Sequence, residues 1–315
     1  MKKKLSSSII TSLLIVSILG ISLQTIGLNT VKADEAAAIW RFTYPLDWFE
    51  ENGWAGETEE SFDVCNYILG RFPIPTYEWT GFYAEPSKST FMSVVDYFNS
   101  DFDYATVFLY GHGHNQTKYG SWYSFGAPSY SVPVEYISFW DSYQTYIDDS
   151  EIYAETSSGN HYFVVMWPCA SGKMIGYYDA DDLTYYPAWY YLGAGPSGMP
   201  FSWTHTNNLS GDGYNSPDTG DYCFIGFESF AVSLVNQTGY SGNTYGDFVK
   251  HFYNSLLTYG DSINDALDYA SDLACNENLF SDTALHDGWT QYVPGQGYWP
   301  TKMRIYGNGD NVLPT

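Results

Sequence analysis

Positive charge is scarce in this 315-residue sequence, which has 12 Lys and Arg against 36 Asp and Glu and a net charge of −24. So few cations exclude the basic surface that binding to nucleic-acid phosphates requires. The same imbalance argues against docking on anionic lipid. Charged residues make up only 15% of the chain and aromatic residues 19%, a composition too aromatic for a disordered protein. We therefore expect an acidic, folded protein that binds neither nucleic acid nor a membrane surface.

Long hydrophobic runs are also scarce, and the one that stands out lies near the N-terminus. Lys2, Lys3 and Lys4 precede an apolar run over residues 9–28, and residues 31–33 (Val-Lys-Ala) give a small-x-Ala ending. This order predicts a signal peptide over residues 1–33 and a secreted, extracellular or cell-surface protein. An uncleaved anchor is the alternative, because about 20 apolar residues can span a bilayer. No linker or repeat divides residues 34–315, so we expect one domain there.

Cysteine is rare, and the four cysteines match no zinc motif. They are Cys65, Cys169, Cys223 and Cys275. Outside the cytoplasm two disulfides are the ordinary expectation, and the alternative is that one cysteine is a reactive thiol. The metalloprotease pattern HExxH and the nucleophile-elbow pattern GxSxG are both missing from the sequence.

No metal site and no required cofactor is expected. The acidic loops 179–182 and 212–221 are rich in oxygen ligands and could hold structural Ca²⁺. They lack the EF-hand pattern, so solvated loops are the other interpretation. Residues 193–198 match GxGxxG, but Pro196 and Pro200 block the helix that a dinucleotide site needs.

Apolar patterning predicts an α/β fold in which strands and helices alternate. The segments predicted as strands are 39–44, 76–85, 104–110, 162–167, 200–206 and 223–228. Those predicted as helices are 60–72, 89–98, 138–149, 247–259 and 262–273. Residues 104–110 and 162–167 are nearly continuous apolar runs, as is typical of strands covered on both faces. We expect a three-layer α/β/α sandwich around a mostly parallel sheet of about six strands.

Residues with catalytic chemistry follow the two buried strand segments. Residues 111–114 (Gly-His-Gly-His) follow the first, and residues 168–172 (Pro-Cys-Ala-Ser-Gly) follow the second. Ligands of open parallel sheets bind beyond the carboxyl ends of the strands, so neighbouring strands would bring His112 and Cys169 to one edge. An imidazole can turn a thiol into the nucleophilic thiolate, and nearby glycines leave backbone amides for an oxyanion.

This arrangement resembles the caspase-like fold of the clan CD cysteine peptidases, and its Gly-His-Gly form is most similar to the gingipain-like branch. The family pattern is a hydrophobic strand followed by His-Gly and a later hydrophobic strand followed by Cys. Residues 248–270 and the ending over residues 306–313 also resemble segments of these domains. The departures are Pro168, where the family often has alanine, and the second histidine, His114.

The resemblance implies a secreted cysteine endopeptidase that cleaves a peptide or protein substrate through a thioester acyl-enzyme. Cys169 would be the nucleophile and His112 the general base, with the backbone amides of Gly113 and Cys169 as the oxyanion hole. His114 is the less favoured base, because His112 is the histidine flanked by two glycines. A buried or disulfide-bonded Cys169 is the alternative.

The resemblance also implies that specificity resides at the end of the first strand and on the strand after the cysteine. Asp47, Trp203 and His205 stand in those places. Asp47 could pair with a basic substrate side chain, and the strongly negative chain would attract such substrates. The alternatives are a solvated surface acid for Asp47 and core packing for Trp203.

Two other functions stay open. The 31 Tyr and 11 Trp would suit a secreted adhesion or glycan-binding protein that stacks on sugars. A caspase-fold relative without activity is the other, because Pro168 constrains the backbone entering the nucleophile turn. A reactive Cys169 would favour the peptidase over both.

Overall fold

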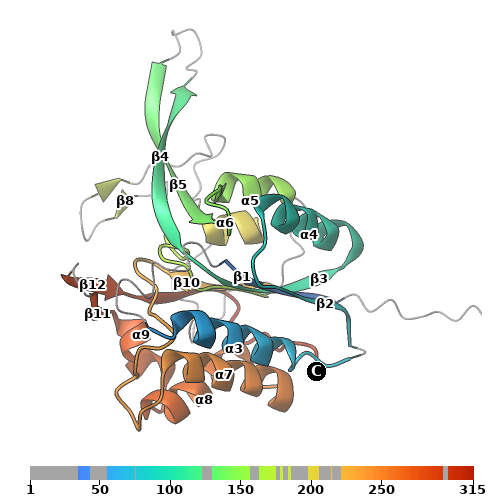
Figure 1. Cartoon of the computed structure of the whole chain (residues 1–315), viewed down its shortest axis with the longest axis vertical. Helices are drawn as coiled ribbons and strands as arrows, with labels where there is room; N and C mark the ends of the chain where they lie inside the picture. Colours follow the sequence, from blue (N-terminus) through green and yellow to red (C-terminus); the bar gives the residue numbers. More distant parts are fainter. Residues whose placement is uncertain are drawn as a thin grey trace, which may run out of the picture. The chain divides into compact units, whose positions relative to one another are not determined.

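A central sheet and the helices that flank it make up most of the described part of the chain (Figure 1). The computed structural model describes residues 35–42, 55–74, 76–122, 130–156, 163–174, 178–179, 184–185, 198–205, 214, 221–293 and 297–315. All of them belong to one unit, Asp34–Thr315. The expected signal peptide, residues 1–33, lies outside the described residues. Within the described ranges, no helix has both the length and the apolar character to cross a bilayer.

The central sheet has six strands in the order β13-β10-β7-β3-β1-β2. They are β1 (Glu35–Arg41), β2 (Tyr77–Tyr83), β3 (Tyr104–Tyr110), β7 (Phe163–Met166), β10 (Cys223–Phe227) and β13 (Met303–Gly307). Every neighbouring pair is parallel except β10 and β13, which are antiparallel. The prediction of a mostly parallel, six-stranded sheet is therefore confirmed.

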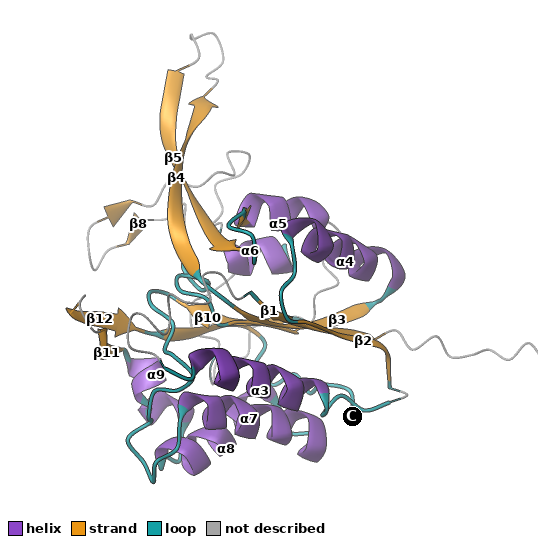
Figure 2. Ribbon diagram, in the orientation of Figure 1, coloured by secondary structure: helices purple, strands orange, loops and turns teal. Residues whose placement is uncertain are grey.

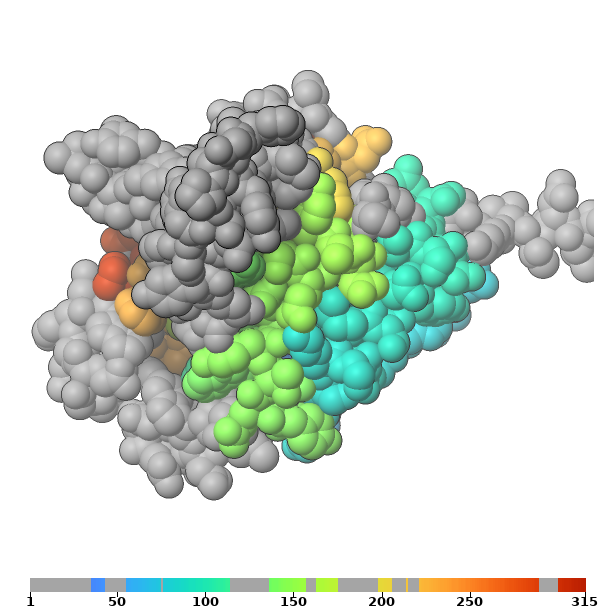
Figure 3. Space-filling view, turned by 90° about the horizontal axis from the view of Figure 1, so that it is seen from above, coloured from blue at the N-terminus to red at the C-terminus, as the bar shows by residue number. Residues whose placement is uncertain are grey.

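Helices cover both faces of this sheet, as a three-layer arrangement requires (Figure 2). One face carries α4 (Lys88–Asp101), α5 (Asp149–Glu155) and α6 (Met199–Thr204). The other carries α3 (Glu57–Leu69), α7 (Tyr245–Asn254), α8 (Ile263–Cys275) and α9 (Ala284–Asp287). In the view from above, residues of α4 and α5 form much of the described outer surface of the first layer (Figure 3).

Two hydrophobic cores lie on the two faces of the sheet, and β1 shows how its residues divide between them. Ala36, Ala38 and Trp40 belong to the core under α4 and α6. Ala37 and Ile39 belong to the core under α3, α7 and α8. This alternation follows from the period of two in a strand, and it explains why the buried strands read as continuous apolar runs.

Smaller elements surround the sheet. They are β4 (Gly113–Trp122), β5 (Tyr130–Trp140), β6 (Tyr146–Asp148), β8 (Tyr178–Asp179), β9 (Thr184–Tyr185), β11 (Trp289–Val293), β12 (Gly297–Thr301), a π-helical turn over Ser255–Tyr259 and a 3₁₀ turn over Phe280–Asp282. β4, β5 and β6 form an antiparallel sheet of their own, which begins next to His112.

The C-terminal helices follow the sequence signals closely. Thr244 and Asp247 form a capping box at the start of α7. The following π-helical turn ends at Gly260, whose φ of 73° is the left-handed conformation expected of a helix-ending glycine. The Ser262 hydroxyl then accepts a hydrogen bond from the amide of Asp265 and caps α8.

Two predicted elements are wrong. Residues 200–206 were expected to form a strand, but α6 occupies Met199–Thr204 and His205 ends it. Proline is favoured in the first turn of a helix, and all six residues of α6 are buried, so no exposed face marked the helical period. Residues 138–149 were expected to form a helix, but they hold the end of β5, a turn and β6. The sixth strand of the sheet is β13, which was not predicted.

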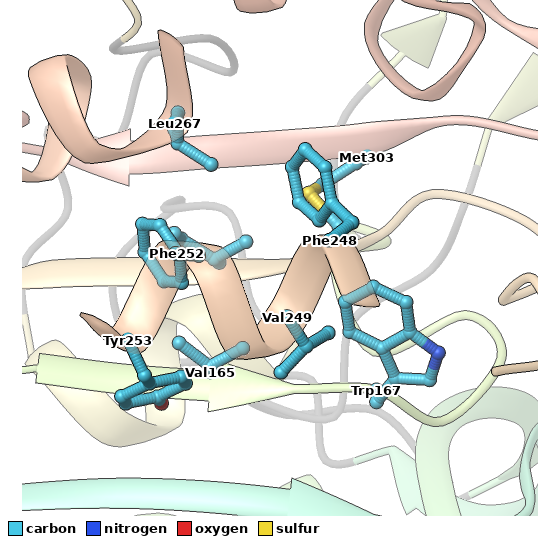
Figure 4. A pocket seen from close by; sticks show the side chains of 9 residues that line it. Val165, Trp167, Phe248, Val249, Phe252, Tyr253, Leu267 and Met303 are labelled. Atoms are coloured by element: carbon cyan, nitrogen blue, oxygen red, sulfur yellow. The ribbon is translucent and has the colours of Figure 1, made fainter. Parts of the chain in front are cut away.

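A small void lies between the sheet and the helices α7 and α8 that pack on it (Figure 4). Its volume is about 10 Å³, and its lining is entirely apolar or aromatic, so it has room for about one water molecule and nothing to bind it. The lining residues are Val165, Trp167, Ile225, Phe248, Val249, Phe252, Tyr253, Leu267 and Met303. The lining residues are buried, so removal of side-chain atoms here would enlarge the void.

We expect Leu267→Ala to lower the free energy of unfolding by about 2–5 kcal/mol, because Leu267 is 1% exposed and lines the void. Leu273→Ala is the matched control on the same helix, since Leu273 is 36% exposed, and it should cost about 1 kcal/mol or less. Urea denaturation followed by circular dichroism measures both. Equal losses for the two variants would contradict the assignment of this core.

Candidate active site

The sheet places the two predicted catalytic residues at the ends of neighbouring strands. His112 follows β3, the third strand of the sheet in chain order, and Cys169 follows β7, the fourth. The two strands pair in parallel from Thr106 opposite Phe163 to Leu109 opposite Met166, a constant offset of 57 residues. Continued past the strand ends, this register puts His112 opposite Cys169. Both residues therefore lie at the carboxyl edge of the sheet, where ligands of such sheets bind.

Gly113 sets how closely the two strand ends approach. A Cβ at this position would lie 2.2 Å from the carbonyl oxygen of Cys169 and 2.9 Å from Cβ of Pro168. Backbone contact this close leaves room only for glycine. On its other side the His112 carbonyl accepts a hydrogen bond from the amide of Trp140 at 3.0 Å. The His-Gly backbone is thus held between the turn that carries Cys169 and β5.

The nucleophile turn, residues 168–172, is tightly bonded to the surrounding strands. Ala170 has a φ of 58°, a left-handed conformation that is uncommon for a residue with a Cβ. The Ser171 hydroxyl donates to the carbonyl of Met166 at 2.9 Å and accepts from the amide of Phe227 at 3.1 Å. The Tyr306 hydroxyl on β13 donates to the carbonyl of Gly172. These bonds hold the turn against β7, β10 and β13.

Residues 228–235, which follow β10, hold the same turn from another side. The carbonyl of Ser229 accepts a hydrogen bond from the amide of Ala170. The amide of Ala231 donates to Sγ of Cys169 at 3.3 Å. The carbonyl of Val232 accepts from Nε1 of Trp167 at 2.7 Å. The sulfur of Cys169 therefore receives a backbone donor from a segment about 60 residues further along the chain.

Desolvation of the imidazole and the sulfur sets the protonation of both candidate catalytic groups, although each residue keeps part of its surface exposed. Burial raises the pKa of the Cys169 thiol to about 11, against the opposing effect of the Ala231 amide. Burial also lowers the pKa of His112 to about 4. Near neutral pH the resting pair is consequently a thiol and a neutral imidazole. Neutral imidazole is the form that can accept a proton from the thiol.

Trp203 and His205, predicted to bind substrate, pack inside the layer of α5 and α6. Trp203 is fully buried, and its ring meets that of Phe91 at 6.3 Å, which matches the core-packing alternative. His205 ends α6 with a φ of 54°, its Nε2 lies 2.8 Å from Oγ1 of Thr156, and its ring stacks on Tyr153 at 4.2 Å. Trp203 lies on α6 and His205 caps its end, so the prediction that they belong to the strand after the cysteine is wrong. The next strand of the central sheet after Cys169 is β10.

Asp47, the third predicted substrate-binding residue, lies outside the described residues. His114 belongs to β4, where it stands opposite Ser138 of β5. Most of the acidic loops 179–182 and 212–221 also lies outside the described part of the chain. Among the residues that are described, no three His, Cys, Asp or Glu side chains form a group that could hold a metal ion.

All four cysteines are free thiols. The ordinary expectation of two disulfides is therefore wrong, and the disulfide alternative for Cys169 falls with it. Cys65 and Cys223 are fully buried, and burial raises the pKa of each thiol well above its usual range. Two of the four thiols, Cys65 and Cys223, are thus inert core residues. Of the two partly exposed cysteines, Cys169 is the one that lies at the carboxyl edge of the sheet next to the His-Gly segment.

Sequence reasoning missed residues 228–235 and the buried carboxylate of Glu57 that binds them. Ala231 acts on Cys169 through its amide, and every residue except proline has that group, so no side-chain signature marks it. Glu57 follows Gly56 at the start of α3, where an acid is ordinary. Its burial depends on partners more than 170 residues away, which no local pattern reveals.

Comparison with known proteins does not assign the chain to a family. No protein-family model matches the chain, and no curated protein matches its sequence. The arrangement of the strand ends is therefore the basis on which a function can be argued.

We expect Gly113→Ala to lower the free energy of unfolding by about 1–3 kcal/mol, because its Cβ would overlap the Cys169 carbonyl. Gly70→Ala is the control: Gly70 has an ordinary φ of −69°, and a Cβ there would come no closer than 3.5 Å to its neighbours. Chemical denaturation compares the two variants. A Gly113→Ala protein as stable as the Gly70→Ala protein would contradict the close approach.

Alkylation of native Cys169 by iodoacetamide should rise about tenfold per pH unit from pH 7 to 10, because burial raises its pKa to about 11 and only the thiolate reacts. Cys65 and Cys223 should stay unmodified until the protein unfolds, because both are 0% exposed. Peptide mapping by mass spectrometry follows each thiol separately. A Cys169 rate that levels off below pH 9 would mean that the thiolate is already stabilised in the free protein.

Proposed function

We propose that the protein is a cysteine peptidase of the caspase-like type, with Cys169 as nucleophile and His112 as general base. The β3–β7 register carries this proposal, because it sets a histidine opposite a cysteine at the carboxyl edge of a mostly parallel sheet. The strand order supports it too: the His and Cys motifs follow the third and fourth sheet strands, in the order that the sequence resemblance implies.

The proposed reaction begins with transfer of the Cys169 thiol proton to His112 as the sulfur attacks the scissile carbonyl carbon. The carbonyl oxygen becomes an oxyanion, which the amides of Gly113 and Cys169 stabilise. Collapse of this intermediate breaks the C–N bond, and His112 gives its proton to the leaving amine. Water, activated by the now neutral His112, then hydrolyses the thioester and restores the thiol.

The protonation of the resting site constrains how this reaction starts. With a thiol pKa of about 11, roughly one Cys169 in 10⁴ is ionised at pH 7. A preformed thiolate is too scarce to be the working nucleophile, so proton transfer to His112 accompanies the attack. Burial lowers the pKa of His112 to about 4, which keeps its imidazole neutral and able to accept a proton but also makes it a weaker base.

A catalytically inactive relative of the same fold is the second candidate. The observation that favours it is the same burial, which opposes the charged form of both groups. An adhesion or glycan-binding role stays a prediction from composition alone. The preference for basic substrates depends on Asp47 and is part of the proposal, whereas Trp203, which is fully buried, has no part in it.

Electrophilic peptide probes test this function directly. A probe carrying an acyloxymethyl ketone should label Cys169 in the unmodified protein, and His112→Ala should slow labelling by about 10²–10⁴-fold, the usual contribution of a general base. Cys169→Ala should abolish labelling, while Cys275→Ala, which removes a half-buried thiol elsewhere, should leave it unchanged. Mass spectrometry identifies the labelled residue.

The outcomes separate the candidates. Equal labelling of the unmodified and His112→Ala proteins, both folded by circular dichroism, would favour the inactive relative. Comparing probes with a basic, an acidic and an apolar side chain at the cleavage position tests the Asp47 assignment. Faster labelling by the basic probe, weakening as salt is added, is the expected result.

A further inference from the structure

Glu57 carries a fully buried carboxylate that accepts four hydrogen bonds. The Tyr110 hydroxyl donates at 2.7 Å, and the amides of Leu234 and Val235 donate at 2.9 and 3.0 Å. The Ser233 hydroxyl is the fourth donor. A carboxylate removed from water is stable only when its oxygens are satisfied in this way, so it holds its donors firmly in place.

These four donors come from the two sides of the candidate active site. Tyr110 is the last residue of β3, two positions before His112. Ser233, Leu234 and Val235 belong to residues 228–235, whose Ala231 donates to the sulfur of Cys169. Glu57 thus connects β3, which leads to His112, with residues 228–235, which contact Cys169. The four hydrogen bonds of its carboxylate do not involve the side chain of His112 or of Cys169.

Glu57 stands at a helix start that is also bonded to β1. It is the first residue of α3, where the helix dipole stabilises negative charge. Arg41 stands opposite Tyr110 in the sheet and donates to the carbonyl of Thr58 at 2.7 Å and to the hydroxyl of Ser61 at 2.9 Å. The guanidinium therefore places a positive charge on the same first turns of α3. The start of α3 is therefore bonded both to β1 and, through Glu57, to Tyr110 and residues 233–235.

We propose that Glu57 is a positioning residue that holds residues 228–235 against the nucleophile turn and ties them to the histidine strand. Its carboxylate keeps the amide of Ala231 on Sγ of Cys169, a residue that is itself partly exposed, and so limits the access of water to that sulfur. The catalytic meaning of this role rests on the proposed peptidase function. The positioning itself concerns the environment of the thiol, which a small alkylating reagent measures without any substrate.

Glu57→Gln tests the proposal. The amide group turns an acceptor atom into a donor that faces other donors, so residues 228–235 should separate from the nucleophile turn. Because burial is the main cause of the high pKa of Cys169, the inflection in its iodoacetamide alkylation should move from about 11 toward the ordinary thiol value. We expect alkylation at pH 8 to become at least tenfold faster and labelling by the peptide probe to become at least tenfold slower.

Glu60→Gln is the matched control. Glu60 lies on the same helix, and its carboxylate pairs with Nζ of Lys250 on α7 at 2.7 Å. The same chemical change there should leave the alkylation profile of Cys169 as it is in the unmodified protein. A general loss of stability would change the alkylation rate in both variants. Faster alkylation together with slower peptide labelling, seen in Glu57→Gln alone, would therefore identify positioning.

A folded Glu57→Gln protein with an unchanged alkylation profile would overturn the proposal. Should this variant fail to fold, Tyr110→Phe and Ser233→Ala each remove one donor and keep the carboxylate. Each should speed alkylation at pH 8 by two- to threefold, and an unchanged rate in both would also overturn it. Absence of peptide labelling in the unmodified protein would refute the peptidase function alone, because the difference between Glu57→Gln and Glu60→Gln would still be measurable.

Discussion

The parallel pairing of β3 with β7 is the constraint on which the rest of the candidate site depends. It joins two strands buried on both faces, and its register, from Thr106 opposite Phe163 to Leu109 opposite Met166, sets where the two strand ends leave the sheet. A slip by one residue would turn every side chain of a strand to the opposite core. The position of His112 relative to Cys169 is therefore held by the packing of both hydrophobic cores, and only secondarily by contacts within the site.

The burial that holds His112 and Cys169 in position also opposes the charged forms that the proposed reaction needs. Desolvation keeps the thiol and the imidazole neutral, so neither group is activated before a substrate arrives. The backbone amides of Ala231 and of Cys169 itself act in the other direction, since their hydrogen bonds to the sulfur lower the pKa of the thiol. A site built this way resists adventitious oxidation and alkylation, because the reactive form is rare in the free protein.

Sequence patterns anticipated the parts of the fold that depend on local periodicity. The buried strands before His112 and Cys169 were recognisable because a strand covered on both faces has no polar side. The same rule failed for residues 200–206, since a helix buried on every side is just as continuously apolar. β13, only five residues long and containing Arg304, offered too weak a pattern. Glu57 and Ala231 act through contacts that span about 60 to 180 residues of sequence, and these exist only once the sheet is assembled.

β13 is the last strand of the sheet in chain order, yet it lies beside β10 and its Tyr306 hydroxyl binds the carbonyl of Gly172 in the nucleophile turn. A ribosome makes residues 303–307 more than 130 positions after that turn. Until then the carbonyl of Gly172 lacks this partner and β10 lacks its outer neighbour. A growing chain can pair β1, β2, β3 and β7 early, but it cannot complete the support of the nucleophile turn. The turn that carries Cys169 therefore gains its full set of hydrogen bonds only after β13 has been synthesised.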